Sequence, residues 1–192
     1  MSTGRLEAFS DGVIAIAITV MVLELKKPDG ATWDSLHAVL SGFFTYVLSF
    51  VMLGIYWNNH HHMLQLTKRV NGAILWANLH LLFWLSLFPY FTEWMGAHHL
   101  AKVPTAAYGV VLLCAAIAFY ILMRAIVRDQ GPDSVVQARI GRDLKGRLSP
   151  VAYALSIPLA FVDRWIAVAI FVGVALVWLI PDRRLESQWS TD

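Results

Sequence analysis

Long apolar runs separated by short polar segments are the main feature of this chain. They lie at about residues 5–26, 36–59, 71–94, 103–127, 146–162 and 164–180. A helix needs roughly 20 mainly apolar residues to cross the hydrocarbon core of a bilayer. The segments between the runs hold Gly, Pro and charged residues, as expected for turns at a membrane surface. The pattern predicts an all-α, polytopic membrane protein, with residues 1–192 forming a single domain of six transmembrane helices.

Several details of the pattern carry more specific expectations. H-H-H-M-L-Q-L-T-K-R at 60–69 and G-A-H-H-L-A-K-V-P at 96–104 are predicted to be turns at the membrane surface. The fifth run is interrupted by Pro158, since a proline removes a backbone donor from a helix. The polar stretch 128–145 is predicted to be a cytoplasmic loop with a short surface helix.

The composition indicates that lipid solvates much of the chain. Hydrophobic residues make up 58% of the 192 residues and charged residues only 15%, which is too apolar for one soluble core. The net charge is +2 and the basic residues lie in connecting segments, which argues against nucleic acid as a partner. The single cysteine, Cys114, excludes an internal disulfide and a thiolate-rich metal site.

The distribution of Lys and Arg predicts the orientation, because cytoplasmic loops carry an excess of these residues. If the N-terminus is inside, only Lys26, Lys27, Lys102 and Arg164 of the 15 Lys and Arg residues lie on the outer side. This distribution favours both termini in the cytoplasm. Such an arrangement needs an even number of spans, and the predicted number of six meets this condition.

Asp11 is an ionisable residue inside the first run, and such a residue by default suggests a function and needs polar partners. The second run returns to the level of Asp11 and the third starts from there. We therefore expect a polar cluster of Ser10, Asp11, Asn58 or Asn59, one or two of His60, His61 and His62, and Asn78.

Two interpretations of this cluster remain open. It fastens the helices in register, or it serves as a proton relay or metal site, because histidine exchanges protons near neutral pH and binds metals. Adjacent residues of a helix point about 100° apart, so the three consecutive histidines cannot all converge on one ion. We favour the structural interpretation and predict no metal site.

Helical spacing divides the first run into two faces. Positions three and four residues apart form a mostly apolar stripe, which comprises Arg5, Phe9, Gly12, Ile16, Thr19, Val20, Leu23 and Lys27. Ser10 and Asp11 lie off this stripe. The stripe fits ordinary helix packing, which spacing alone favours. It also fits a pore around a symmetry axis, where rings of apolar side chains gate by dewetting.

R-L-E-A-F-S-D at 5–11 resembles the R-x-x-x-F-S-D signature that opens the first helix of the transmembrane-protein-175 family of potassium channels. Y-W-N-N-H-H at 56–61 and N-L-H-L-L-F-W-L-S-L-F-P at 78–89 resemble the end of that family's second helix and its third helix. The resemblance covers about the first half of the chain well and the second half only in hydropathy. It implies a prokaryotic, single-repeat member that assembles as a homotetramer in the cell membrane.

The resemblance also implies roles for single residues. The first helices would line a central pore for potassium ions, with constrictions at Ile16, Val20 and Leu23 and with Thr19 and Ile16 contributing to selectivity. The signature network that fastens the helices would comprise Arg5, Phe9, Ser10, Asp11, Trp57, His60, His61 and Asn78. The T-V-G-Y-G filter is absent, so selectivity would come from side-chain rings and would be modest.

Two other functions compete with a channel. A proton-coupled secondary transporter would use Asp11 and the histidines, but it predicts inverted repeats with broken helices, and none is evident in the sequence. A non-conducting membrane scaffold is the other alternative. The motifs H-E-x-x-H, H-x-x-E-H and G-x-S-x-G are absent, so we expect no enzyme and no cofactor besides the permeant ion.

Overall fold

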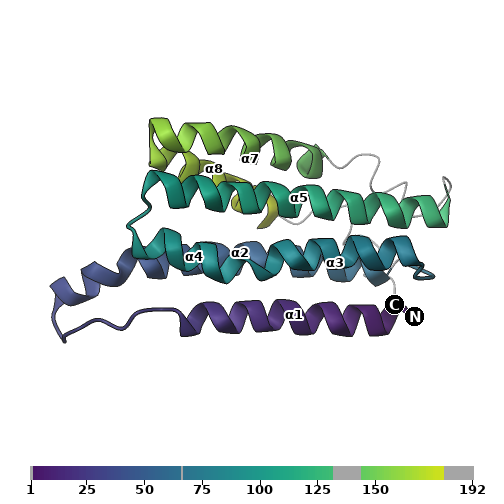
Figure 1. The fold of residues 1–192 in the computed structure, drawn as a ribbon, viewed down its shortest axis with the longest axis horizontal. Coiled ribbons are helices and arrows are strands. Elements are labelled where there is room, and N and C mark those ends of the chain that lie inside the picture. Colours follow the sequence, from purple (N-terminus) through teal and green to yellow (C-terminus); the bar gives the residue numbers. More distant parts are fainter. Residues whose placement is uncertain (1, 66, 132–143, 180–192) are drawn as a thin grey trace, which may run out of the picture.

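The computed structural model describes residues 2–65, 67–131 and 144–179, and all regular secondary structure within them is helical. The helices are α1 (Thr3–Leu23), α2 (Trp33–Gln65), α3 (Gly72–Ser86), α4 (Phe88–Ala97), α5 (Lys102–Gln130), α7 (Leu144–Val162) and α8 (Arg164–Leu179). They run along the long axis of the molecule, with α1 at one edge and α7 at the other (Figure 1). The predicted all-α class is therefore confirmed for the described residues.

Four helical segments among the described residues are long and apolar enough to cross a membrane. These segments are α1, α2, α5 and the pair α3 and α4 taken together, Gly72–Ala97. The helix α8 is apolar but shorter, with 16 residues. These features support a multi-pass membrane protein. The number of six spans and the position of the termini stay predictions.

The third apolar run is broken, which the sequence analysis did not detect. Leu87 separates α3 from α4, and its N–H donates to the Trp84 carbonyl at 3.3 Å, three residues back. The cause is Pro89 in the first turn of α4, because proline has no N–H to donate to the carbonyl four residues earlier. By contrast, α7 continues through Pro158, so the expected interruption there is wrong. Transmembrane helices tolerate a proline when neighbouring groups satisfy the freed carbonyl.

The second helix is longer than its predicted run. The expected turn at 60–69 is wrong for residues 60–65, which form the last turns of α2. His60, Met63 and Leu64 are buried there, so packing against neighbouring helices outweighs the polar composition of the segment. Likewise, α5 extends to Gln130, so the first residues of the predicted loop 128–145 are helical. Residues 132–143 of that loop lie outside the described residues.

Hydrogen bonds at one end of the bundle fix where α1, α2 and α3 meet. Thr3, the first residue of α1, donates through Oγ1 to the Thr67 carbonyl at 3.2 Å, just after α2 ends. The Asn71 carboxamide oxygen accepts from the Ile74 N–H at 2.9 Å and caps the start of α3. Its amide nitrogen donates to Asp129 of α5 at 2.8 Å. This end of the bundle therefore brings together the start of α1 and the end of α2.

Near the opposite end, α2 and α4 pack in close contact at Gly96. A Cβ atom on this residue would lie 2.8 Å from the Gly42 Cα and 2.5 Å from the Thr45 Oγ1. Real Cβ atoms do not approach a backbone atom so closely, so the two helices would have to separate. Gly96 therefore sets the distance between α2 and α4.

We expect Gly96→Ala to lower the thermal unfolding temperature of the purified protein in detergent. Overpacking of this kind costs roughly 1–3 kcal/mol, because the backbone of α2 cannot move aside as a side chain can. Gly54→Ala on α2 is the matched control, since a Cβ atom there meets nothing within 4 Å. Equal unfolding temperatures for the two variants would contradict the assigned role of Gly96.

Candidate functional site

A buried chain of hydrogen bonds joins α1, α2 and α3 through one side chain from each helix. Asn78 Nδ2 donates to Ser10 Oγ at 3.0 Å, and Ser10 donates in turn to the Leu6 carbonyl at 2.8 Å. Asn78 Oδ1 lies 2.7 Å from His60 Nε2. All three side chains are fully buried and cannot bind bulk water, so these hydrogen bonds satisfy their polar atoms instead.

The direction of the chain assigns a proton on His60. A carboxamide oxygen only accepts hydrogen bonds, so His60 must donate to Asn78 through Nε2. The other ring nitrogen, Nδ1, is buried and has no hydrogen-bond partner among the described residues. One ring nitrogen of His60 therefore holds α3, and the other has no protein partner among the described residues.

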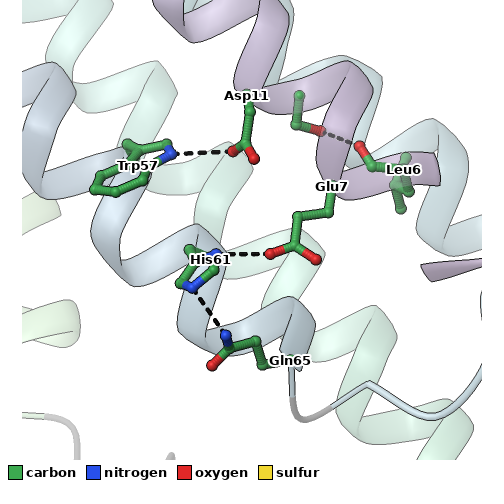
Figure 2. A network of polar contacts seen from close by, with 7 residues as sticks. Leu6, Glu7, Asp11, Trp57, His61 and Gln65 are labelled. Carbon is green, nitrogen blue, oxygen red and sulfur yellow. Dashed lines mark hydrogen bonds and ion pairs between the residues drawn. The ribbon is translucent and has the colours of Figure 1, made fainter. Parts of the chain in front are cut away.

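Two further contacts join α1 to α2 beside this chain (Figure 2). Trp57 Nε1 donates to Asp11 Oδ1 at 3.0 Å. One turn away, Glu7 Oε1 lies 2.6 Å from His61 Nδ1. Gln65 Nε2 is 2.8 Å from the other ring nitrogen of His61. The second helix thus presents an indole and an imidazole to two carboxylates of the first helix.

Several expected members of the polar cluster lie elsewhere. Asn59 donates to the Ile55 carbonyl of its own helix at 2.8 Å, and Asn58 is exposed. The expectation that one of them joins the cluster is therefore wrong, because a bond within the same helix satisfies Asn59. Arg5 and Phe9 are exposed, and no hydrogen bond or ion pair joins either to the network within the described residues. Those residues also contain no group of three or more His, Cys, Asp or Glu that could hold a metal ion.

Much of the apolar stripe of α1 is exposed on the surface of the described chain. The Ile16 side chain is 64% exposed and that of Leu23 is 80% exposed, whereas Val20 is half-buried. The opposite face of the helix is buried and carries Leu6, Ser10, Ile14, Ala17 and Met21. Packing within the described residues covers only part of the stripe, and the exposed part is available to lipid or to a second copy of the chain.

Thr19 is the hydroxyl-bearing residue of this stripe. It is exposed, and its hydroxyl donates to the Ile16 carbonyl at 2.9 Å within α1. Because this bond uses its one hydrogen, the lone pairs of the oxygen remain available as acceptors. The side chain therefore presents oxygen, and no donor, to whatever occupies the space beside α1.

A groove of about 460 Å³ runs beside the stripe, between α1 and the broken helix. Ile16 and Val20 line one wall, and Pro89 and Tyr90 line the other. The carboxylates of Glu24 and Glu93 also belong to its lining. The sequence analysis did not place Glu93 beside α1, since only the fold brings the two segments together.

Two further sets of polar contacts in the structure were not predicted from the sequence, one at Glu7 and one in the core of the bundle. Glu7 could have been found, because it precedes Asp11 by one helical turn and shares its face. The second group is a buried set on α2, α4 and α5: Ser49 Oγ lies 2.6 Å from Thr92 Oγ1 and 2.8 Å from the Tyr108 hydroxyl. No local signal in the sequence connects these three positions.

Comparisons with known proteins identify the family of the chain. Residues 5–89 match the family described as the endosomal/lysosomal potassium channel TMEM175. A potassium channel from Chryseobacterium sp. is 53% identical over 186 residues, which cover 97% of each chain. A potassium channel from Streptomyces collinus is 34% identical over 92% of this chain and 91% of the relative.

A solved structure is also similar along nearly the whole chain. The crystal structure of a lysosomal potassium-selective channel TMEM175 homolog from Chamaesiphon minutus aligns with a TM-score of 0.82 and 29% identity. The alignment covers 93% of this chain and 96% of that one. These likenesses place the protein in a class of membrane channels and not in an enzyme class. The chain belongs to the TMEM175 family as a prokaryotic member, as the R-x-x-x-F-S-D signature predicted.

Proposed function

We propose that the protein is a potassium-permeable cation channel of the cell membrane, formed by four copies of a six-span domain with both termini in the cytoplasm. The names of its relatives, which are called potassium channels, support potassium as the permeant ion. The observation that carries the proposed pathway is the exposed stripe of α1, whose Ile16 and Leu23 side chains are 64% and 80% exposed. If four copies of α1 surrounded an axis, the stripe would face the water of the pore or the same stripe of the neighbouring copies.

The composition of the stripe favours a pore over simple contact with lipid. A lipid-facing surface gains nothing from the Thr19 hydroxyl or the Gly12 backbone, yet both lie on the same face as Ile16. Residues three and four positions apart lie about one helical turn, 5.4 Å, apart along the axis. Rings of Ile16, Val20 and Leu23 would therefore follow one another along the pore as constrictions that close by dewetting.

Selectivity is proposed to arise from these rings and from Thr19. The chain has no T-V-G-Y-G loop that could supply a cage of carbonyls. Ile16 would set the width of the pathway and thus the cost of removing water from the ion. The Thr19 oxygen would coordinate a partly dehydrated cation through its lone pairs, because its hydrogen is already bonded to the Ile16 carbonyl. We therefore propose modest discrimination between potassium and sodium.

The polar face of α1 has a different proposed task. Ser10, Asn78 and His60 hold α1 to α2 and α3, while the contact between Asp11 and Trp57 adds a second attachment. These side chains point into the bundle of one subunit and away from the stripe. We therefore assign them to the support of the pore helix and not to its lining.

Planar-bilayer recordings of the purified protein under a potassium/sodium gradient test the proposal. We expect ohmic currents that reverse toward the potassium equilibrium potential, together with a tetramer in native mass spectrometry. Saturable, proton-coupled uptake without single-channel currents would favour a transporter instead. A protein that assembles but passes no ion under any condition would identify a scaffold.

A further inference from the structure

Glu7 and His61 form a contact between the start of α1 and the end of α2 that the proposed ion pathway does not use (Figure 2). One helical turn away, Asp11 accepts a hydrogen bond from Trp57. The two helices are thus joined by two neighbouring contacts, each with a carboxylate on α1. Indole does not take up a proton near neutral pH, whereas imidazole does. Only the contact between Glu7 and His61, here called the clasp, can become an ion pair.

The hydrogen-bond partners of His61 suit both its neutral and its protonated form. Neutral His61 with its hydrogen on Nδ1 donates to Glu7 and accepts from Gln65 Nε2 at 2.8 Å. After protonation, the Gln65 carboxamide can rotate and present its oxygen to Nε2, so both states keep their hydrogen bonds. The side chains of His61 and Glu7 are 31% and 22% exposed, which gives protons from water access to them.

The charged and titratable groups around His61 come from two helices. Glu7 and Asp11 approach from α1, and His60 and His62 are its neighbours on α2, with the His62 ring centroid 5.6 Å away. The Trp57 ring stacks on His61, with the ring centroids 5.8 Å apart and the ring planes at 21° to each other. The helices α4 and α8 also pack against α2. However, α4 lies at the opposite end of the bundle and α8 begins there, so their Glu93 and Arg164 do not face the clasp (Figure 1).

We propose that Glu7 and His61 are positioning residues that make conduction sensitive to cytoplasmic pH. A proton on His61 turns the hydrogen bond of the clasp into an ion pair, which holds α1 against α2 in the described arrangement. The proposal rests on the proposed function, in which α1 carries the constrictions. Because Glu7 and Ile16 belong to one continuous helix, a fixed inner end restrains the outward shift that would widen the apolar rings.

Inside-out patches that contain the protein test this proposal, because the cytoplasmic face can then be titrated from roughly pH 8 to pH 6, the range in which histidine changes its charge. We expect the wild-type potassium current to fall severalfold on acidification. The Glu7→Gln and His61→Gln variants, assayed separately, should lose most of this dependence. His62→Gln is the matched control and should keep the wild-type profile, because His62 contacts the His61 ring on α2 and makes no described contact with α1.

The possible results separate the clasp from the channel itself. A wild-type current that does not change with cytoplasmic pH would overturn the clasp and leave the channel standing. A full pH response in Glu7→Gln and His61→Gln, or its loss in His62→Gln, would also overturn the clasp. A current that rises on acidification would overturn the assignment of the described arrangement to the restrained state. Absence of current at every pH would overturn both proposals.

Discussion

Replacing Ile16 with Asn is expected to raise potassium flux through the reconstituted protein by roughly tenfold or more, which corresponds to a barrier about 1.4 kcal/mol lower. The Ile16 side chain is 64% exposed on the stripe of α1. In the proposed tetramer, four copies of this residue face the axis, and their apolar surface expels water from the constriction. A carboxamide at this position would keep the constriction hydrated. Leu23→Asn, at a side chain that is 80% exposed, should act in the same direction.

Val22→Asn provides the matched control for these two variants. Val22 is 47% exposed and lies on the same helix, but it falls outside the stripe. It therefore adds the same carboxamide to α1 without placing it in a proposed constriction. Flux is measured in liposomes at equal protein content, and the ratio of potassium to sodium flux is recorded in parallel. Wild-type flux in both Ile16→Asn and Leu23→Asn, or an equal rise in Val22→Asn, would remove the stripe from the ion pathway.

Hydropathy was sufficient to predict the fold class but not the ends of the helices. Runs of apolar residues that match the thickness of a bilayer predict helices whatever they contact. The last turns of α2 contain three consecutive histidines, and only the packing of His60 and Leu64 against other helices explains their helical structure. The prolines show the same limit: Pro89 accompanies a break and Pro158 does not. Whether a freed carbonyl finds another partner depends on tertiary structure.

The candidate site was predictable in its location and less so in its contacts. The return of the second and third runs to the level of Ser10 follows from topology, and the structure brings Ser10, Asn78 and His60 into one hydrogen-bonded chain. The resemblance placed Asp11 and Trp57 in the same network, whereas the pattern of residues alone suggested asparagine and histidine side chains around Asp11. Its carboxylate contacts Trp57, a residue whose position at a span end equally suits a membrane anchor. Side-chain directions on two packed helices decide between such partners, and the sequence alone does not contain them.

The two faces of α1 explain why charged residues lie beside a proposed pore without lining it. Glu7, Ser10 and Asp11 contact α2 or α3, whereas Ile16 and Leu23 are exposed and the Thr19 hydroxyl bonds within α1. We expect a movement of α1 that opens the constrictions to occur against the clasp, while the buried chain of Ser10, Asn78 and His60 keeps α1 in place. The free energy of the clasp is therefore part of the free energy of opening. Variants of the polar face should accordingly change both stability and conduction.

Replacing Asn78 with Leu is expected to lower the thermal unfolding temperature of the protein markedly and to abolish potassium flux. The substitution leaves Ser10 and His60 buried without their partner on α3. An unsatisfied buried polar group costs about 1–3 kcal/mol. The His60 ring becomes such a group in this variant, whereas Ser10 keeps its bond to the Leu6 carbonyl and loses only the donor from Asn78. The attachment of α1 to α3 through Ser10 is also lost, so α1 is no longer held in the described position.

The control for Asn78→Leu is Asn59→Leu, which should have a small effect. It removes a half-buried carboxamide whose bond, among the described residues, is to the Ile55 carbonyl of its own helix. The combined variant Ser10→Ala, His60→Met and Asn78→Leu separates stability from positioning. Because it removes the polar groups of the network together, it should regain much of the lost unfolding temperature. If the network positions α1, flux should stay low in this variant even when the tetramer is recovered. Full recovery of flux along with stability would show that the network only satisfies buried polar atoms and does not position the pore helix.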